Sequence, residues 1–117
     1  MPVSRECAVA LKELGFDEPT NGFYWTKSNY FTSDKLKYQY NSENHNYSVV
    51  FISAPDHLQA ADWLWGKFAI EFQFNKAFTK LIYRGNNHME YSVFSNANHR
   101  YTAILKACEI AKELKHK

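Results

Sequence analysis

The sequence has little glycine, proline and cysteine, and it contains no long apolar run. Four Gly and three Pro interrupt 117 residues, of which 45% are hydrophobic and 22% charged, so a disordered low-complexity chain is excluded. No apolar stretch approaches the ~20 residues that a membrane-spanning helix needs. The first residues lack the apolar core of a secretory signal. We therefore expect one globular domain over residues 1–117, located in the cytoplasm and without a membrane partner.

The net charge is also small, and there are few thiols. The net charge of +2 is too small to require a nucleic acid or an acidic membrane as partner. The two cysteines, Cys7 and Cys108, lie near opposite ends of the sequence, each on the apolar side of an expected helix. We interpret them as buried reduced thiols.

Motifs that carry chemistry are missing. None of the five histidines belongs to an H-E-x-x-H pattern, and the cysteines do not have zinc-like spacing. There is no G-x-S-x-G, P-loop or G-x-G-x-x-G sequence. A Cys–His pair formed in space stays open. We expect no catalytic residue, no metal, no cofactor and no enzymatic activity.

Aromatic residues are abundant: nine Phe, eight Tyr and three Trp make 17% of the chain. Broad rings pack well across the pleated face of a sheet, so this composition favours strands. The six segments that we expect to be strands are residues 23–27, 36–40, 47–52, 70–74, 79–84 and 89–94. In the second of them Leu36, Tyr38 and Tyr40 should face the core, with Lys37 and Gln39 outside.

Helical periodicity marks three segments, residues 4–14, 55–68 and 98–114. Ser4 suits the N-cap of the first helix and Gly15 its end, while Pro55 suits the first turn of the second. The element order is thus α-βββ-α-βββ-α, each half being a helix followed by a three-stranded meander, with residues 42–46 as a hairpin loop. This order predicts a two-layer α+β domain, with a mainly antiparallel sheet and helices on one face.

Several short segments carry a resemblance. They are Leu14-Gly15-Phe16-Asp17-Glu18-Pro19, Ala54-Pro55, Gln59-Ala60, Asp62-Trp63-Leu64 and the closing helix 103–114 with its Ala107-Cys108 step. Together, over about a third of the chain, they resemble a group of small uncharacterised proteins carried by prophages and mobile elements of gut anaerobes. The resemblance brings no activity. It implies a small intracellular accessory protein that modulates a host system.

The resemblance also bears on the second helix. A stripe through Leu58, Ala61, Leu64, Trp65 and Phe68 would place Trp63 on the opposite, polar side. In the similar proteins a Trp recurs at the position of Trp63, whereas the position of Trp65 is often polar. We therefore predict that Trp63 is mostly buried and that Trp65 is partly exposed.

Residues 23–31 contain consecutive aromatic side chains, which alternate between the two faces of a strand. Either the strand is covered on both sides, or some of these rings form a partner surface. For the second alternative the candidate residues are Tyr24, Asn29, Tyr30 and Lys35, because exposed Tyr side chains are typical interface anchors.

The sequence leaves three possible functions, which we give in order of preference. The first is a non-enzymatic protein-interaction or regulatory module of a phage or mobile element, binding a host protein or its own copies as a monomer or weak dimer. The second is a small-ligand or nucleotide-binding, sequestering protein, for which Arg84, Asn86 and His88 would have to converge on one cleft. The third is a single-stranded nucleic-acid binder using basic and aromatic strand residues, and we rank it last because the charges and rings fall on opposite faces.

Overall fold

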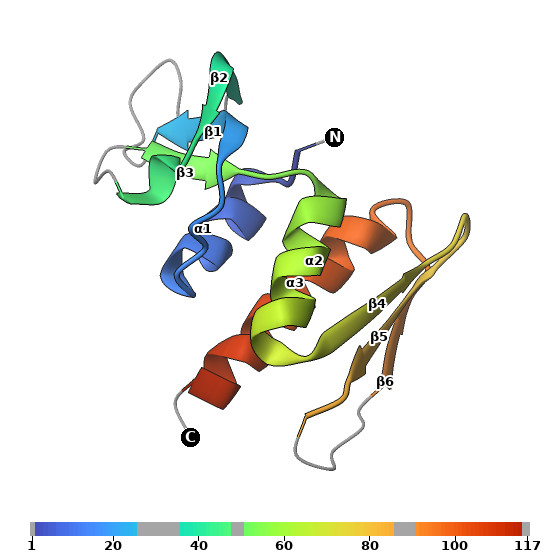
Figure 1. The fold of residues 1–117 in the computed structure, drawn as a ribbon. Helices are drawn as coiled ribbons and strands as arrows, with labels where there is room; N and C mark the ends of the chain where they lie inside the picture. The colour runs from blue at the N-terminus through green and yellow to red at the C-terminus, as the bar shows by residue number, and fades with distance from the viewer. Residues whose placement is uncertain (1, 26–35, 48–50, 86–90, 116–117) are drawn as a thin grey trace. The chain divides into compact units, whose positions relative to one another are not determined.

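The computed structural model describes residues 2–25, 36–47, 51–85 and 91–115, with three α-helices and six strands. The chain forms two compact units, unit 1 (Met1–Asp56) and unit 2 (His57–Lys117). Figure 1 shows one three-stranded antiparallel sheet in each unit. The α+β class and the predicted order of elements are confirmed. The strands, however, form two separate sheets of three, where we had expected one mainly antiparallel sheet.

Unit 1 begins with α1 (Arg5–Glu13), whose ends are those that the sequence predicts. The Ser4 side chain caps it by accepting a hydrogen bond from the Cys7 amide. At the other end Gly15, at φ +94°, donates to the Lys12 carbonyl, and Phe16 donates to the Leu11 carbonyl. This is the Schellman arrangement, which needs a left-handed residue just beyond the helix.

The sheet of unit 1 has the order β2-β1-β3, so the expected meander is wrong for this half. Its elements are β1 (Thr20–Trp25), β2 (Lys37–Glu43), the short 3₁₀-helix η1 (His45–Tyr47) and β3 (Phe51–Ala54). The strand that comes first in sequence lies in the centre and pairs with both neighbours. Residues 42–46 therefore do not join a hairpin, because the two strands on either side of them lie on opposite sides of β1.

The central place of β1 corrects two predictions. Tyr24 is 6% exposed, and its hydroxyl donates to the Val3 carbonyl at 2.8 Å, so this ring is part of the core and is not a surface anchor. Tyr38, expected inside, is 66% exposed, because α1 packs against β3, at the opposite edge of the sheet from β2. Ile52, Ser53 and Ala54 of β3 are buried, and α1 packs against this strand.

Unit 2 contains α2 (His57–Phe68), α3 (His99–Lys115) and a true meander of three strands. The strands are β4 (Ile70–Phe74), β5 (Thr79–Tyr83) and β6 (Tyr91–Phe94). Both helices pack on the sheet, α2 against β4 and α3 against all three strands (Figure 1). The core of the unit is apolar, with Leu64, Ile70, Leu81 and Ile104 at most 1% exposed.

The prediction for the two tryptophans of α2 is confirmed. Trp63 is 5% exposed, with its ring edge-on to Phe68 at 5.8 Å, whereas Trp65 is 50% exposed. The buried face of α2 runs through Ala60, Ala61 and Leu64. Both cysteines are buried as predicted, and desolvation raises the pKa of the Cys7 thiol.

Candidate functional site

Two large apolar side chains stand exposed on the outer side of α2. Leu58 is 57% exposed and Trp65 50%. Together with Ala61 and Asp62 they occupy positions i, i+3, i+4 and i+7, which is one continuous face of a helix. This face borders the buried one through Ala60 and Leu64, and the buried Ala61 belongs to both. Apolar side chains gain no burial free energy while they stand in water, and the grouping of these two on one face makes it the candidate site.

A one-residue turn brings this face over β4. Ala69 is the single residue between the two elements and has φ +57°, in the left-handed region that L-residues with side chains seldom adopt. Its amide donates to the Trp65 carbonyl, and its own carbonyl accepts from the Arg84 amide. The chain thereby reverses at once, and α2 and β4 run antiparallel next to each other.

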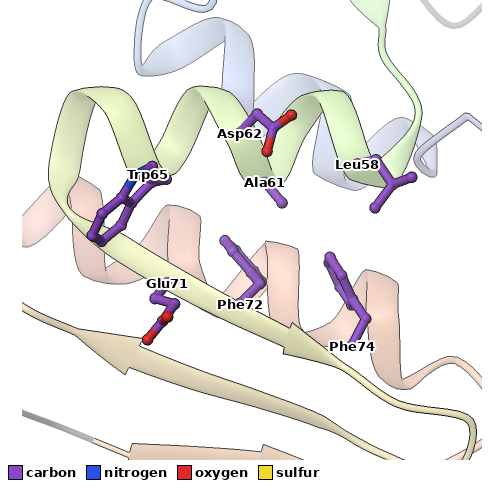
Figure 2. A pocket seen from close by; sticks show the side chains of 7 residues that line it. All are labelled: Leu58, Ala61, Asp62, Trp65, Glu71, Phe72 and Phe74. Atoms are coloured by element: carbon purple, nitrogen blue, oxygen red, sulfur yellow. The ribbon is translucent and has the colours of Figure 1, made fainter.

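A groove of about 430 Å³ lies between α2 and β4, which we call the α2–β4 groove. Its lining residues are Leu58, Ala61, Asp62, Trp65, Glu71, Phe72 and Phe74. Figure 2 shows Phe72 and Phe74 rising from β4 toward α2, with Leu58 above the Phe74 end and Trp65 above the Glu71 end. Asp62 lies between Leu58 and Trp65 along the helix. The groove is thus lined mainly by apolar side chains, together with the carboxylates of Asp62 on α2 and Glu71 on β4.

Charged side chains fix both ends of the groove. Arg84 donates to the same Glu71 oxygen from Nε at 2.9 Å and from Nη2 at 2.8 Å. At the other end the Arg100 guanidinium lies over the Phe74 ring, 5.9 Å from its centroid, and donates to His57 Nε2 at 3.4 Å. His57 meets the same ring edge-on at 5.3 Å. These contacts hold Glu71 and Phe74 in place.

The second hollow, of about 530 Å³, lies in unit 1 and is lined by Arg5, Val9, Lys12, Glu13 and Ile52. The Lys12 ammonium, which would be its main binding group, donates to the Phe51 carbonyl at 2.7 Å. Partial burial lowers the pKa of Lys12. This cation holds α1 to β3, so we regard the hollow as part of the fold and place the candidate site in the smaller groove.

The residues singled out from the sequence are not those of the groove. Tyr24 is in the core and is not a surface anchor. Arg84 is exposed and pairs with Glu71, and its role in a ligand site stays a prediction. The other candidates, Asn29, Tyr30, Lys35, Asn86 and His88, lie outside the described residues. The sequence did predict that Trp65 is partly exposed. The other groove residues could have been found from one pattern in the sequence, a helix with apolar residues on two faces that is followed directly by an alternating strand.

The groove is lined by rings, aliphatic groups and two carboxylates, and it offers no nucleophile paired with a base. Over the described ranges there is no cluster of three or more His, Cys, Asp or Glu side chains that could hold a metal ion. Within the same part of the chain, no helix combines the length and the apolar character needed to cross a membrane.

Comparison of the chain with protein-family models, with curated proteins and with solved structures gave no match. The function is therefore inferred from the groove itself.

Proposed function

We propose that this protein is a non-enzymatic protein-interaction module and that the α2–β4 groove is its docking site. The observation that carries the proposal is the pair Leu58 and Trp65, half exposed on one helix face above Phe72 and Phe74. Tryptophan is among the residues that most often contribute the binding energy of protein interfaces, especially when a partner desolvates it fully. A partner that covers this face would bury all four side chains.

The cellular setting is part of the same proposal. The resemblance to prophage-borne proteins supports an accessory protein that works in the cytoplasm and acts on a host protein. Such a role needs recognition and no chemistry, which agrees with a groove whose lining is mainly apolar. A positively charged lining would instead favour a nucleic acid.

Sequestration of a small ligand is the second candidate. A volume of about 430 Å³ lies within the usual range of small-molecule sites, and Arg100 with His57 supplies a polar end. Small-molecule pockets, however, bury most of the ligand's surface, whereas Leu58 and Trp65 leave this groove open along its length. We therefore rank it second.

Site-specific photo-cross-linking tests the docking function. A benzoylphenylalanine at position 58 should capture a discrete host protein in living cells, and Trp65→Ala in the same chain should abolish the capture. The matched control places the cross-linker at Lys106, an exposed residue of α3 that pairs with Glu109. Equal capture from positions 58 and 106, or none from position 58, would contradict the proposal. A small-molecule adduct found by intact mass measurement would favour the second candidate.

A further inference from the structure

The backbone of β4 has an open edge beside the groove. In the order β4-β5-β6, β4 is an outer strand. The Asn75 amide donates to the Phe78 carbonyl and the Arg84 amide donates to the Ala69 carbonyl, and both pairs keep the register that aligns Phe72 with Leu81. Bonded and non-bonded pairs alternate in an antiparallel ladder. Glu71 and Gln73 therefore bond to β5, and the N–H and C=O groups of Phe72 and Phe74 face outward.

This edge lacks several of the usual protections against pairing. Its sequence, Ile-Glu-Phe-Gln-Phe, contains no proline, no lysine and no inward-pointing charge, which are among the devices that natural sheets use to block their edges. Its one charged side chain, Glu71, is paired with Arg84. Directly opposite residues of neighbouring strands point to the same face of a sheet. A strand added beside β4 would therefore direct every second side chain into the α2–β4 groove.

Building on the proposed docking function, we propose that the partner docks as an extended segment that adds a fourth, antiparallel strand to β4. Three of its side chains enter the groove, opposite Ile70, Phe72 and Phe74. Those opposite Ile70 and Phe74 are apolar, because they meet Trp65 and Leu58 respectively. The one opposite Phe72 is Lys or Arg, because it lies next to Asp62, for which the described residues provide no cation. The recognised pattern is apolar-x-basic-x-apolar.

Charge favours such a partner over a second copy of this chain. Two β4 strands paired antiparallel about Phe72 would be related by a two-fold axis. Asp62 lies near the middle of the groove (Figure 2), so the axis would bring the two Asp62 carboxylates to the same junction. Like charges in contact oppose association. A lysine stem, in contrast, packs along the phenylalanine rings and carries its ammonium to Asp62.

A set of synthetic peptides tests this mode on the full chain. The probe is fluorescein-labelled Thr-Val-Thr-Lys-Thr-Val-Thr, titrated by fluorescence polarisation. The amides of its Val and Lys residues would bond to β4, and those of its Thr residues would point away. N-methylation of the Lys amide should therefore weaken binding about ten-fold, whereas N-methylation of the neighbouring Thr should change it by about two-fold at most.

A charge swap tests the expected ion pair between the peptide Lys and Asp62. Replacing the peptide Lys with Glu should weaken binding about three- to five-fold, and Asp62→Lys in the protein should restore the affinity of the Glu peptide. Hydrogen exchange gives an independent readout. On binding, the amides of Phe72 and Phe74 should gain protection, while those of Glu71 and Gln73, already bonded to β5, should change less.

Equal effects of the two N-methylations, or no saturable binding of the Lys peptide, would overturn the added strand. If the peptide fails while the cross-linker at position 58 still captures a partner, the docking function stands and the strand mode falls. If both experiments fail, the groove is not a docking site. Restored affinity in the Asp62→Lys exchange together with amide-specific N-methyl effects supports the complete inference.

Discussion

The two units differ in whether the chain itself hydrogen-bonds the outward backbone groups of an outer strand. In unit 1 the outer strand β3 is hydrogen-bonded to η1: the Asn46 side chain accepts the Ser53 amide through Oδ1 at 2.7 Å, and the His45 backbone amide donates to Ser53 Oγ at 2.9 Å. In unit 2 the outer strand β4 borders an apolar groove, and its outward amides have no such cover among the described residues. One outer strand is thus hydrogen-bonded by the chain itself, and the other is the strand to which we propose that a partner adds.

The units also hold themselves together differently. Polar side chains bind the main chain throughout unit 1, as when His45 Nε2 donates to the Thr20 carbonyl and Asn46 Nδ2 donates to the Phe16 carbonyl. Unit 2 relies mainly on apolar packing around Trp63, Leu64 and Ile104, with one buried polar pair between Thr79 Oγ1 and His99 Nδ1 at 2.7 Å. Hydrogen bonds of the first kind fix a unique arrangement, because a buried polar group left without its partner is costly.

The largest effect should come from the core of unit 2. Trp63→Ala should lower the free energy of unfolding by ~3–5 kcal/mol, as expected for truncating a large buried ring. Trp65→Ala is the matched control on the same helix. Since half of its surface is already in water, it should cost about 1 kcal/mol or less. Urea unfolding followed by circular dichroism measures both.

Equal stability of the Trp63→Ala variant and the wild type would contradict the assignment of Trp63 to the core. Trp63 would then become the better candidate for the docking anchor. The Trp65→Ala variant should keep the wild-type fold and lose capture in the cross-linking experiment, which separates binding from stability.

The second effect opens the closed edge of unit 1. Asn46→Ala removes the acceptor of the Ser53 amide and the donor to Phe16, so it should cost about 2 kcal/mol, because Ser53 is fully buried. The Ser53 amide should also exchange faster with solvent. Asn75→Ala is the control. The Asn75 side chain donates from Nδ2 to the Gln73 carbonyl at an exposed turn, so its loss should cost about 0.5 kcal/mol. A similar loss in both variants would show that the η1 side chains do not close the edge.

Much of the fold could be predicted from the sequence, and the part that could not be predicted has a physical cause. The three helices, the alternation of Ile70–Phe74 and the burial of Cys7 follow from local periodicity and capping. Strand order does not, because pairing between distant strands is decided by the whole fold. The order β2-β1-β3 is what moved Tyr24 into the core and Tyr38 into solvent. The groove was missed because it needs α2 and β4 to be placed next to each other.

The third effect concerns how each unit ends its first helix. Unit 1 uses Gly15 at φ +94°, and unit 2 uses Ala69 at φ +57°. Gly15→Ala should lower the stability by about 1 kcal/mol through backbone strain alone, because a Cβ at this position meets no neighbour within 4 Å. Ala69→Gly should raise it by about 0.5 kcal/mol, because relief of the left-handed backbone strain outweighs the cost of the greater freedom that glycine gives the unfolded chain.

Thermal unfolding of these two variants gives the two signs directly. Opposite signs are expected, and a loss of stability in both would mean that the Ala69 side chain contributes packing that outweighs its strain. The Ala69→Gly variant should bind the Lys peptide as the wild type does, because residue 69 does not line the groove.

The smallest effect on stability, and the sharpest on the open edge, should come from Asp62→Asn. Asp62 is exposed, and the change is nearly isosteric, so the free energy of unfolding should move by about 0.5 kcal/mol at most. Removing the carboxylate also removes the repulsion between two copies paired along β4. Sedimentation should therefore show the wild type as a monomer and the variant as a weak, concentration-dependent dimer. Asp17→Asn, at an exposed position of unit 1, makes the same change in net charge and should leave the protein monomeric. Dimerisation of both variants would assign the effect to net charge instead of the groove, and dimerisation of the wild type would show that Asp62 does not keep the β4 edge from pairing with itself.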